Sequence, residues 1–234
     1  MGVGASVVRN ARAAPAQTNY MRLRDLIRAD IVEGRLPSGA RLKIDELARR
    51  YESSAIPVRE ALQQLQGEGV VVFSPNRGAR VRRIDADFLR NIYEVRVLTE
   101  PFLIRWFARH RSDAQLAALD NAQRAYDRSI AEDVPELWHS HNLVFHSICY
   151  GSHYNDEARA IAERHNDLLH ALATRFPSSR SRALQVCREH WAIIEMVRLQ
   201  NEDAAAAIVA EHVRHAGQDL IERMRAAQSA AANS

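Results

Sequence analysis

The strand pattern of this 234-residue chain is confined to one short stretch, and that confinement limits the folds it can adopt. Two β-rich runs, 70–73 and 79–81, flank a Ser-Pro-Asn-Arg-Gly turn, which predicts a single hairpin. Before the hairpin, apolar residues recur at helical spacing over 20–34, 44–51 and 54–67. The N-terminal third therefore consists of three helices followed by one hairpin.

The rest of the chain is helical throughout. No strand pattern follows Asp85, and helices are predicted at 86–111, 113–131, 134–150, 155–175, 179–200 and 202–227. Short breaks separate them, so we expect an antiparallel all-α bundle of about six helices. The predicted fold is mainly α, with three parts: a disordered tail over 1–18, a winged helix-turn-helix over 19–84 and the helical bundle over 85–228.

The charges are distributed unevenly along the chain. Up to Ile84 there are 15 Arg and Lys against 8 Asp and Glu, whereas the remainder has 17 against 21. A basic end suggests contact with a polyanion, although an Arg-rich solvated surface gives the same count. The sequence contains no run of about 18 apolar residues, so it predicts no membrane span. Two widely spaced cysteines, Cys149 and Cys187, fit a reduced cytoplasmic protein better than a disulfide framework.

The third predicted helix has the features of a DNA-recognition helix. In a helix-turn-helix, the second helix of the motif enters the major groove and presents its N-terminal residues to the bases. Arg59 adjoins the core position Val58, so its side chain can point outward toward guanine or phosphate. At the hairpin tip, a cation and a glycine can follow the phosphates or the minor groove. The candidate DNA-binding residues are Lys43, Ser54, Ile56, Arg59, Arg77 and Gly78.

Three motifs stand out in this region: Ile31-x-x-Gly34-x-Leu36-Pro37-x-Gly39-x-x-Leu42, Pro57-Val58-Arg59-Glu60-Ala61-Leu62 and Arg77-Gly78-x-x-Val81. Together they resemble the GntR family of winged-helix regulators over residues 20–84. The resemblance implies a double-stranded DNA partner. Relatives usually carry Ser-Arg-Thr before the proline, where this chain has Ser54-Ala55-Ile56. Ile56 is expected to contact a thymine methyl group in place of the missing arginine.

Three of the ten histidines occupy related positions. His190 and His212 each lie on an apolar helix face, and each is 11 residues from Asn201, the turn between their helices. In an antiparallel hairpin the two therefore lie at the same level. His146 follows Asn142 by one helical turn. Three imidazoles and one carbonyl oxygen could coordinate a transition metal, although a histidine on an apolar face is more often a hydrogen-bonded core residue.

The helical part contains four further motifs: Arg96-x-x-x-Glu100, Asn142-x-x-Phe145-His146, Glu189-His190 and Glu211-His212. They resemble the C-terminal ligand-binding (FCD) domain of FadR-type GntR regulators over residues 86–225. Many relatives bind zinc or nickel through one Asp and three His, and here Asn142 stands at the Asp position. The resemblance implies a divalent transition metal held by Asn142, His146, His190 and His212. The neutral amide weakens the expected affinity and leaves positive charge that an anionic effector would balance.

Arg96 lies on an apolar stripe of its predicted helix, in phase with Ile92 and Leu103. A buried guanidinium needs a partner, and Glu100 one turn later is the structural one. The resemblance implies a second role for Arg96, which would bind the carboxylate of a small organic acid effector through two hydrogen bonds. Arg96 and Asn142 are therefore the candidate effector-binding residues.

Taken together, these patterns indicate a DNA-binding transcription regulator, a repressor rather than an enzyme, whose operator binding a small anionic metabolite modulates. A homodimer on a palindromic operator is expected, because one helix-turn-helix covers few base pairs. A metal-dependent hydrolase is the alternative, since a three-histidine site can activate water. Against it, no His-Glu-x-x-His segment is present, and Glu189 and Glu211 point about 100° away from the adjoining histidines. A purely structural nucleoid protein leaves the histidines unexplained.

Overall fold

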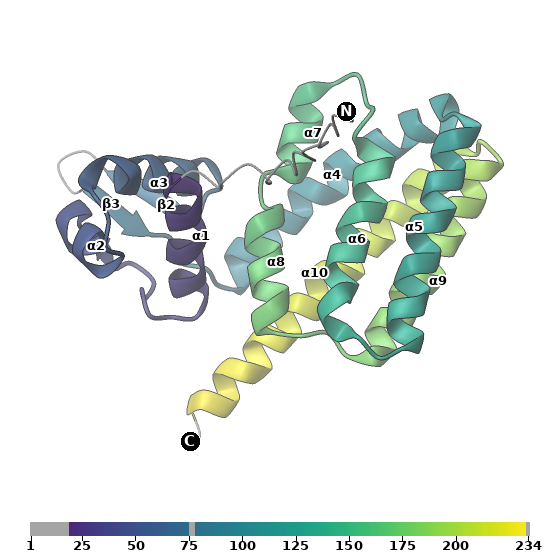
Figure 1. Cartoon of the computed structure of the whole chain (residues 1–234). Helices are drawn as coiled ribbons and strands as arrows, with labels where there is room; N and C mark the ends of the chain where they lie inside the picture. The colour runs from purple at the N-terminus through teal and green to yellow at the C-terminus, as the bar shows by residue number, and fades with distance from the viewer. Residues whose placement is uncertain (1–18, 75–77, 233–234) are drawn as a thin grey trace, which may run out of the picture.

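The computed structural model describes residues 19–74 and 78–232, with side chains through Ala230 (Figure 1). A small N-terminal part over 19–84, which we call the head, precedes a helical part from Asp85 onward, which we call the bundle. The predicted disordered tail, 1–18, and the DNA-binding candidate Arg77 lie outside the described residues. Within the described ranges, no helix is both long enough and apolar enough to cross a membrane.

The head contains the predicted three helices and the hairpin, together with one additional strand. Its elements are α1 (Asn19–Val32), β1 (Arg41–Leu42), α2 (Ile44–Arg50), α3 (Ala55–Gly67), β2 (Val71–Ser74) and β3 (Gly78–Val81). The sheet is antiparallel with β3 in the centre, so that Val81 pairs with Val71 and Arg80 pairs with Arg41. The sequence does not predict β1, because two residues are too few to show an alternating pattern.

The apolar faces of α1 and α3 form the core of the head. Leu23 and Ile27 of α1 belong to the same buried cluster as Leu62 and Leu65 of α3, and all four are fully buried. α1 ends just before Gly34, which has a left-handed φ of +83° that glycine adopts at little cost. Because one face of α3 is taken up by this core, its opposite face is left for contacts outside the head.

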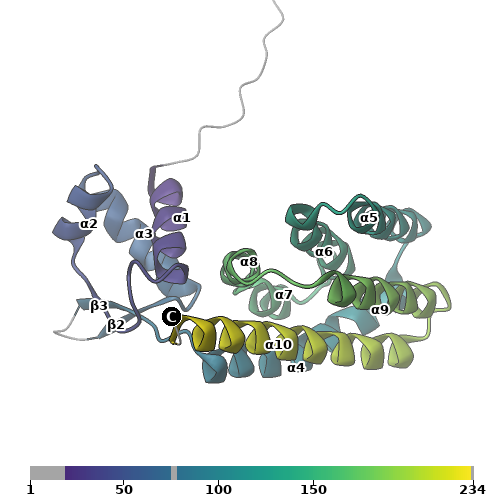
Figure 2. The same cartoon turned by 90° about the horizontal axis from the view of Figure 1, so that it is seen from below.

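The bundle is built on two long helices that lie side by side, α4 (Ala86–His110) and α10 (Glu202–Ala232) (Figure 2). α6 (Pro135–Tyr150) and α9 (Arg180–Arg198) pack against this pair, and α5 (Asp113–Ala131) packs against α6 and α9. Caps mark the predicted breaks: Asp85 accepts a hydrogen bond from the Phe88 amide, and Ser112 forms a capping box with Gln115.

The prediction of one helix over 155–175 is wrong. The segment forms two helices, α7 (Asp156–Glu163) and α8 (Asn166–Arg175), so that the described bundle has seven helices rather than about six. The residues between them make distant contacts: Arg164 Nε donates to the Gly67 carbonyl of the head at 2.7 Å, and the His165 ring packs edge-on against Phe88 at the start of α4. These partners are distant in sequence, so no local pattern marks the break.

The break also sends the two helices into different cores. α7 buries Ala158 and Ala162 in the hydrophobic core of the bundle. α8 instead contributes Leu168, Leu169 and Leu172 to the core of the head. One straight helix could not bury residues in both places. The core of the head therefore continues into the bundle, through α8 and also through residues of α4 and α10.

Candidate DNA-binding surface and histidine cavity

The outer face of α3 carries the predicted DNA-binding residues of this helix. Ser54 occupies the N-cap position with an extended backbone, and its side chain makes no capping hydrogen bond. Ile56 is 71% exposed, which is unusual for a large apolar side chain. Arg59 is exposed, and no ion pair to it is found among the described residues. A hydroxyl, a branched apolar group and an unpaired cation thus lie together at the start of one helix.

The remaining candidates flank this helix. Lys43 precedes α2 and is exposed, but it pairs with Glu46 at 2.6 Å, which reduces the charge available to DNA. Gly78 begins β3 with a left-handed φ of +71°, a position that side chains rarely adopt. A Cβ added to Gly78 would lie 4.0 Å from Arg41 Nε. Arg41 therefore belongs to the same surface, and the sequence does not single it out because its strand is not predicted.

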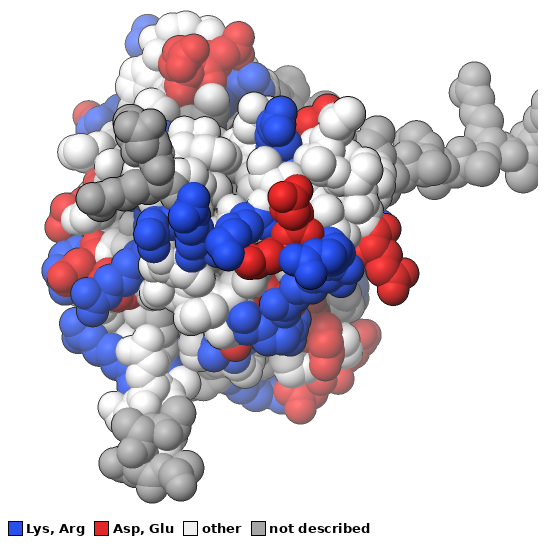
Figure 3. All heavy atoms as spheres, turned by 90° about the vertical axis from the view of Figure 1, so that its left-hand side faces the viewer, with Lys and Arg blue, Asp and Glu red and all other residues white. Residues whose placement is uncertain are grey.

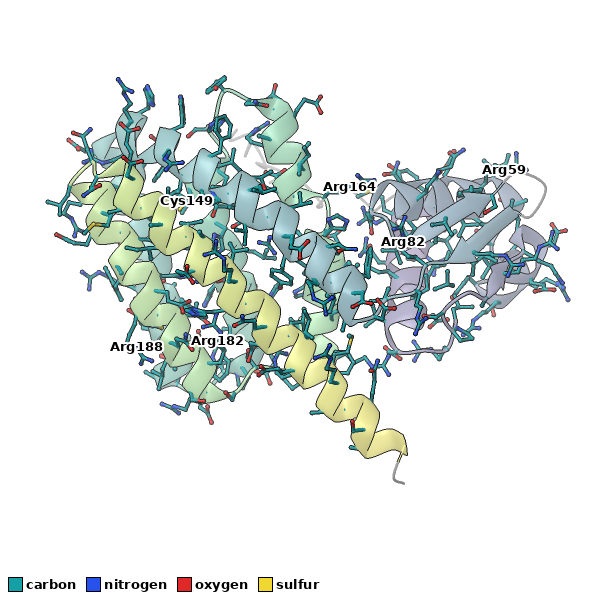
Figure 4. All side chains as sticks on the ribbon, turned by 180° about the vertical axis from the view of Figure 1, so that it is seen from behind. Arg59, Arg82, Cys149, Arg164, Arg182 and Arg188 are labelled. Carbon is teal, nitrogen blue, oxygen red and sulfur yellow. The ribbon has the colours of Figure 1, made fainter. Side chains whose placement is uncertain are left out.

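Positive charge gathers on this side of the molecule. Figure 3 shows Lys and Arg side chains spread across the outer face of the head. Figure 4 places Arg59 at the end of the head that is farthest from the bundle, whereas Arg82 and Arg164 lie near the junction of the two parts. The exposed face of α3 can therefore meet a large partner without interference from the bundle.

In the bundle, the structure brings the three predicted histidines together. His146 of α6, His190 of α9 and His212 of α10 each offer one ring nitrogen, and these nitrogens all lie within 4.8 Å of one another. The three side chains are buried, with exposed fractions of 7%, 0% and 4%. The imidazole rings of His190 and His212 are 4.9 Å apart, as the equal spacing from the helix turn predicts.

Each histidine points its other ring nitrogen at a hydrogen-bond acceptor. His190 Nδ1 lies 2.7 Å from Gln123 Oε1, and His212 Nδ1 lies 2.7 Å from Glu189 Oε2. His146 Nδ1 lies 3.2 Å from the Tyr150 hydroxyl, which itself donates to Glu100 Oε2 at 2.9 Å. We assign the ring proton to Nδ1 in all three, since only a protonated nitrogen satisfies these acceptors.

This assignment leaves three Nε2 lone pairs directed at one another. His146 Nε2 and His212 Nε2 are 3.2 Å apart, a distance at which two lone pairs repel. His190 Nε2 is buried and has no hydrogen-bond partner among the described residues. Outward Nδ1–H groups held by acceptors and inward lone pairs are the usual arrangement of metal-binding histidines. The donor set therefore fits a divalent transition metal.

The electrostatic environment keeps His146 and His190 in the neutral, ligating form. Burial lowers the pKa of His146 and His190 well below the usual histidine value, and the neighbouring imidazoles add to the effect. Burial opposes ionisation of Glu189, but hydrogen bonds from His212 and Arg182 and the charge of Arg182 keep the pKa of this carboxyl below its usual value. Neutral imidazoles backed by an ionised carboxylate are suited to coordinating a cation.

Next to the histidines lies a cavity of about 150 Å³ that reaches side chains of α4, α6, α8, α9 and α10. His146 and His212 line one part of it, together with Asn142 and Arg96. The structure thus brings together both candidate effector-binding residues and two of the three histidines. Asn142, one turn before His146, faces the same cavity with a neutral amide.

Arg96 is mostly buried and has one acidic partner. Its Nε lies 2.5 Å from Glu100 Oε1, and its guanidinium lies over the Tyr93 ring at 5.4 Å. Burial alone would disfavour the charged form, but the Glu100 carboxylate outweighs burial and raises the pKa of Arg96. The described residues offer no hydrogen-bond acceptor to Arg96 Nη1 or Nη2. A ligand anion in the cavity could therefore take up those hydrogens.

Several residues of this site are not predicted from the sequence. Glu189 does point away from His190, its neighbour, as helix geometry requires. It reaches His212 on the next helix instead, and it also accepts a hydrogen bond from His215 at 2.8 Å. Gln123 and Tyr150 carry no motif that marks them as partners of histidines. Packing of α9 against α5 and α10 brings Gln123 to His190 and Glu189 to His212, whereas Tyr150 lies one turn after His146 on α6 itself.

In the comparison with known proteins, the head and the bundle match two different family descriptions. Residues 19–81 match the bacterial regulatory proteins of the gntR family, and residues 91–215 match the FCD domain. The chain is 24% identical over 199 residues to the uncharacterized HTH-type transcriptional regulator YdhC of Bacillus subtilis strain 168, covering 84% of this chain and 88% of YdhC. It is 27% identical over 204 residues to the HTH-type transcriptional repressor GlaR of Escherichia coli K12, covering 82% and 86%.

A solved structure has the same fold. Escherichia coli McbR/YncC superposes with a TM-score of 0.66 at 16% sequence identity, over 88% of this chain and 98% of McbR/YncC. GntR-family regulators bind DNA operators, and FCD domains bind small-molecule effectors and often metals. The matched proteins are transcription regulators rather than enzymes, so the hydrolase alternative is wrong and the prediction of a non-enzyme is confirmed. This chain belongs to the GntR family of bacterial regulatory proteins and carries an FCD domain.

Proposed function

We propose that this protein is a repressor whose binding to a palindromic operator is modulated by a small anionic metabolite held in a metal-associated pocket. Residues 19–84 would bind DNA, and residues 85–228 would bind the effector and form the dimer. One observation carries the proposal: three buried Nε2 lone pairs converge beside a cavity that also exposes the Arg96 guanidinium. GlaR, which is named a repressor, supports the direction of regulation.

On the DNA side, Arg59 would contact guanine and Ile56 a thymine methyl group, because both side chains are exposed at the start of the recognition helix. Ser54 and Lys43 would contact phosphates next to this helix. Arg77 and Gly78 would follow the backbone or the minor groove from the hairpin. Base contacts would set the sequence preference, and phosphate contacts would set the orientation of the head on the duplex.

On the effector side, His146, His190 and His212 would hold zinc or nickel, with Asn142 as a weak fourth ligand. When bound, the metal supplies positive charge for an anionic ligand. The three histidines and Asn142 would be neutral as metal ligands, so they would leave the positive charge of the metal uncompensated. Arg96 would bind the carboxylate of the effector from the same side of the cavity, and Glu100 would keep Arg96 oriented through its bond to Nε.

α8 offers a route from the pocket to the DNA-binding head. Asn166 and Leu169 of this helix line the cavity. Asp167, between them, accepts a hydrogen bond from Arg28 Nη2 of the head at 3.1 Å. Arg28 also holds Glu68, the residue that follows the recognition helix, through two bonds of 2.9 and 2.8 Å. A ligand that displaces α8 would therefore change the orientation of the recognition helix.

The dimer would form through the outer face of α4. Val95, Leu98 and Phe102 recur at helical spacing on this face and are 46%, 76% and 39% exposed. A contiguous apolar stripe of this kind on a soluble surface usually marks an interface. A second copy of the chain is the partner that fits, because a palindromic operator needs two heads related by a two-fold axis. Two bundles joined at α4 would hold their heads at a fixed spacing.

The proposal can be tested by selecting duplexes from random DNA with the full-length chain. We expect a palindromic consensus whose affinity falls steeply with salt, and complexes that contain two chains per duplex. Small organic acids would then change the affinity of that consensus duplex in fluorescence anisotropy. Selection of no consensus, or a consensus whose affinity no acid changes, would contradict the DNA-binding or the sensing half, respectively.

A further inference from the structure

The cavity contains cationic groups that the proposed metal site does not use. Arg182 of α9 and Arg223 of α10 both line it. Arg182 Nη2 and Arg223 Nη1 are buried and have no hydrogen-bond partner among the described residues. A buried guanidinium hydrogen without an acceptor is costly, and native proteins rarely leave one in that state.

The carboxylates near these two arginines are already engaged. Arg182 Nη1 binds Glu189, which also accepts hydrogen bonds from His212 and His215. Arg223 binds Asp219 Oδ2 through both Nε and Nη2, at 2.9 and 2.8 Å. Each carboxylate thus fixes one side of a guanidinium and leaves the other side without a protein acceptor. The free sides belong to residues that line one cavity.

The backbones of these arginines lie farther from the helix turn than the histidines do, although the Arg182 side chain extends toward the turn as far as Glu189, which bonds His212. Arg182 lies eight residues before His190, and Arg223 lies 11 residues after His212. At 1.5 Å of rise per residue, the backbone positions are about 12 Å and about 16 Å along the helix axes from the two histidines. Because α9 and α10 are joined at Asn201, both displacements run in the same direction, away from the turn.

The side chains between the two ends are mainly apolar. Leu169, Val186, Val213 and Ala216 line this middle part of the cavity. Arg96 and Arg223 both act on His139, which also lines the cavity: burial, then His170, then these two cations lower the pKa of His139 to about 4. His139 is therefore neutral near pH 7, and it adds no competing charge between the cationic ends.

We propose that Arg182 and Arg223 form a second anion subsite and that the effector is a small organic diacid. One carboxylate lies at the end formed by Arg96 and the histidines, the methylene chain lies against the apolar middle, and the second carboxylate accepts hydrogens from Arg182 Nη2 and Arg223 Nη1. A cavity of about 150 Å³ suits a ligand of benzene-like size or slightly larger, such as a diacid of roughly four or five carbons. This inference rests on the proposed effector role of the same cavity.

The test compares diacids with monoacids of equal chain length. Calorimetric titration of the full-length, zinc-equilibrated protein would use succinate and glutarate against butyrate and pentanoate. We expect each diacid to bind at least about tenfold more tightly than its monoacid partner, because the second carboxylate gains charge-assisted hydrogen bonds. The comparison needs no substitution, so it does not depend on a variant that folds.

A pair of variants locates the second subsite. Arg223→Gln should weaken the binding of diacids about tenfold and leave monoacid binding unchanged. Arg225→Gln, an exposed change two residues later on the same helix, should alter neither. Equal affinities for diacid and monoacid in the wild type would overturn the second subsite and leave the proposed effector role standing. Binding of neither class would overturn both, and equal loss of both classes in Arg223→Gln would overturn the assignment to one end.

Discussion

The head and the bundle place their candidate functional groups in opposite environments. The head keeps an apolar core and carries Ile56 and Arg59 on its surface. The bundle also has an apolar core, but it places its candidate groups in the interior, where His190 and Glu100 are both 0% exposed. A surface group can change without disturbing the fold, whereas a buried polar group needs a partner in every state. DNA contact thus depends on exposure, and sensing depends on polar groups that the protein itself leaves incompletely paired.

The largest effect that would separate the two regions is expected from His190→Ala. The substitution removes one of three converging Nε2 atoms, and even loss of a hydrogen-bonding partner of a metal ligand costs about 10- to 100-fold in affinity. Zinc affinity in a competition assay with a chelator should therefore fall by more than about 100-fold. His141→Ala, outside the cluster, is the matched control. Unchanged zinc binding in His190→Ala would remove the metal from this account of the bundle.

Arg59→Ala should affect the head alone. Operator affinity is expected to drop roughly 5- to 150-fold, which corresponds to the loss of one good contact to a base. The thermal midpoint and the zinc content should stay the same, because Arg59 is exposed and its charge is unpaired among the described residues. Arg90→Ala, an exposed arginine of α4, serves as the control in the same anisotropy assay. If Arg59→Ala binds the operator as tightly as the wild type, α3 is not the recognition helix.

Asn142→Asp sharpens the comparison within the bundle by changing charge with almost no change in shape. A carboxylate next to His146 should tighten zinc binding roughly tenfold, because it adds an anionic ligand beside a cation. The same negative charge should weaken the binding of organic acids in the cavity that Asn142 lines. Calorimetric titrations with zinc and with succinate measure the two effects separately. No change in either affinity would mean that Asn142 does not belong to the site.

The smallest effect is expected where the two regions meet. Asp167→Asn removes the charge that Arg28 binds across the junction, at an oxygen 3.1 Å away. Affinity for the operator and for the acid should each change little, but the factor by which the acid alters operator affinity should shrink roughly two- to tenfold. Asp156→Asn, which removes an ion pair within α7, is the control. Identical responses of Asp167→Asn and the wild type would exclude this contact as the route.

The parts of the molecule that depend on local patterns are predictable from the sequence. The order of the helices, the hairpin and the level of His190 and His212 follow from spacing over a few turns, and the structure agrees. The break at His165 is not predictable in this way, because its contacts come from residues such as Phe88 that are far away in sequence.

In the candidate site, likewise, the residues that depend on local patterns are predictable from the sequence and the others are not. Apolar phase identifies the buried positions of His190 and His212, and one-turn spacing relates His146 to Asn142, since both are local properties of a helix. The partners Glu189 and Gln123 and the second pair of cavity arginines depend on how far long side chains reach across helices. Helix phase fixes where a side chain starts but not where its charged end lies, so such contacts require the packed structure.

The central claim is that one small anion in the bundle and the operator at the head influence each other. The most direct measurement is a thermodynamic cycle in which diacid affinity is determined with and without saturating operator, and operator affinity with and without saturating diacid. Linkage requires the two ratios to be equal, and the account predicts a shared factor of roughly 5- to 150-fold. A diacid that binds the protein while both ratios remain at one would contradict the account.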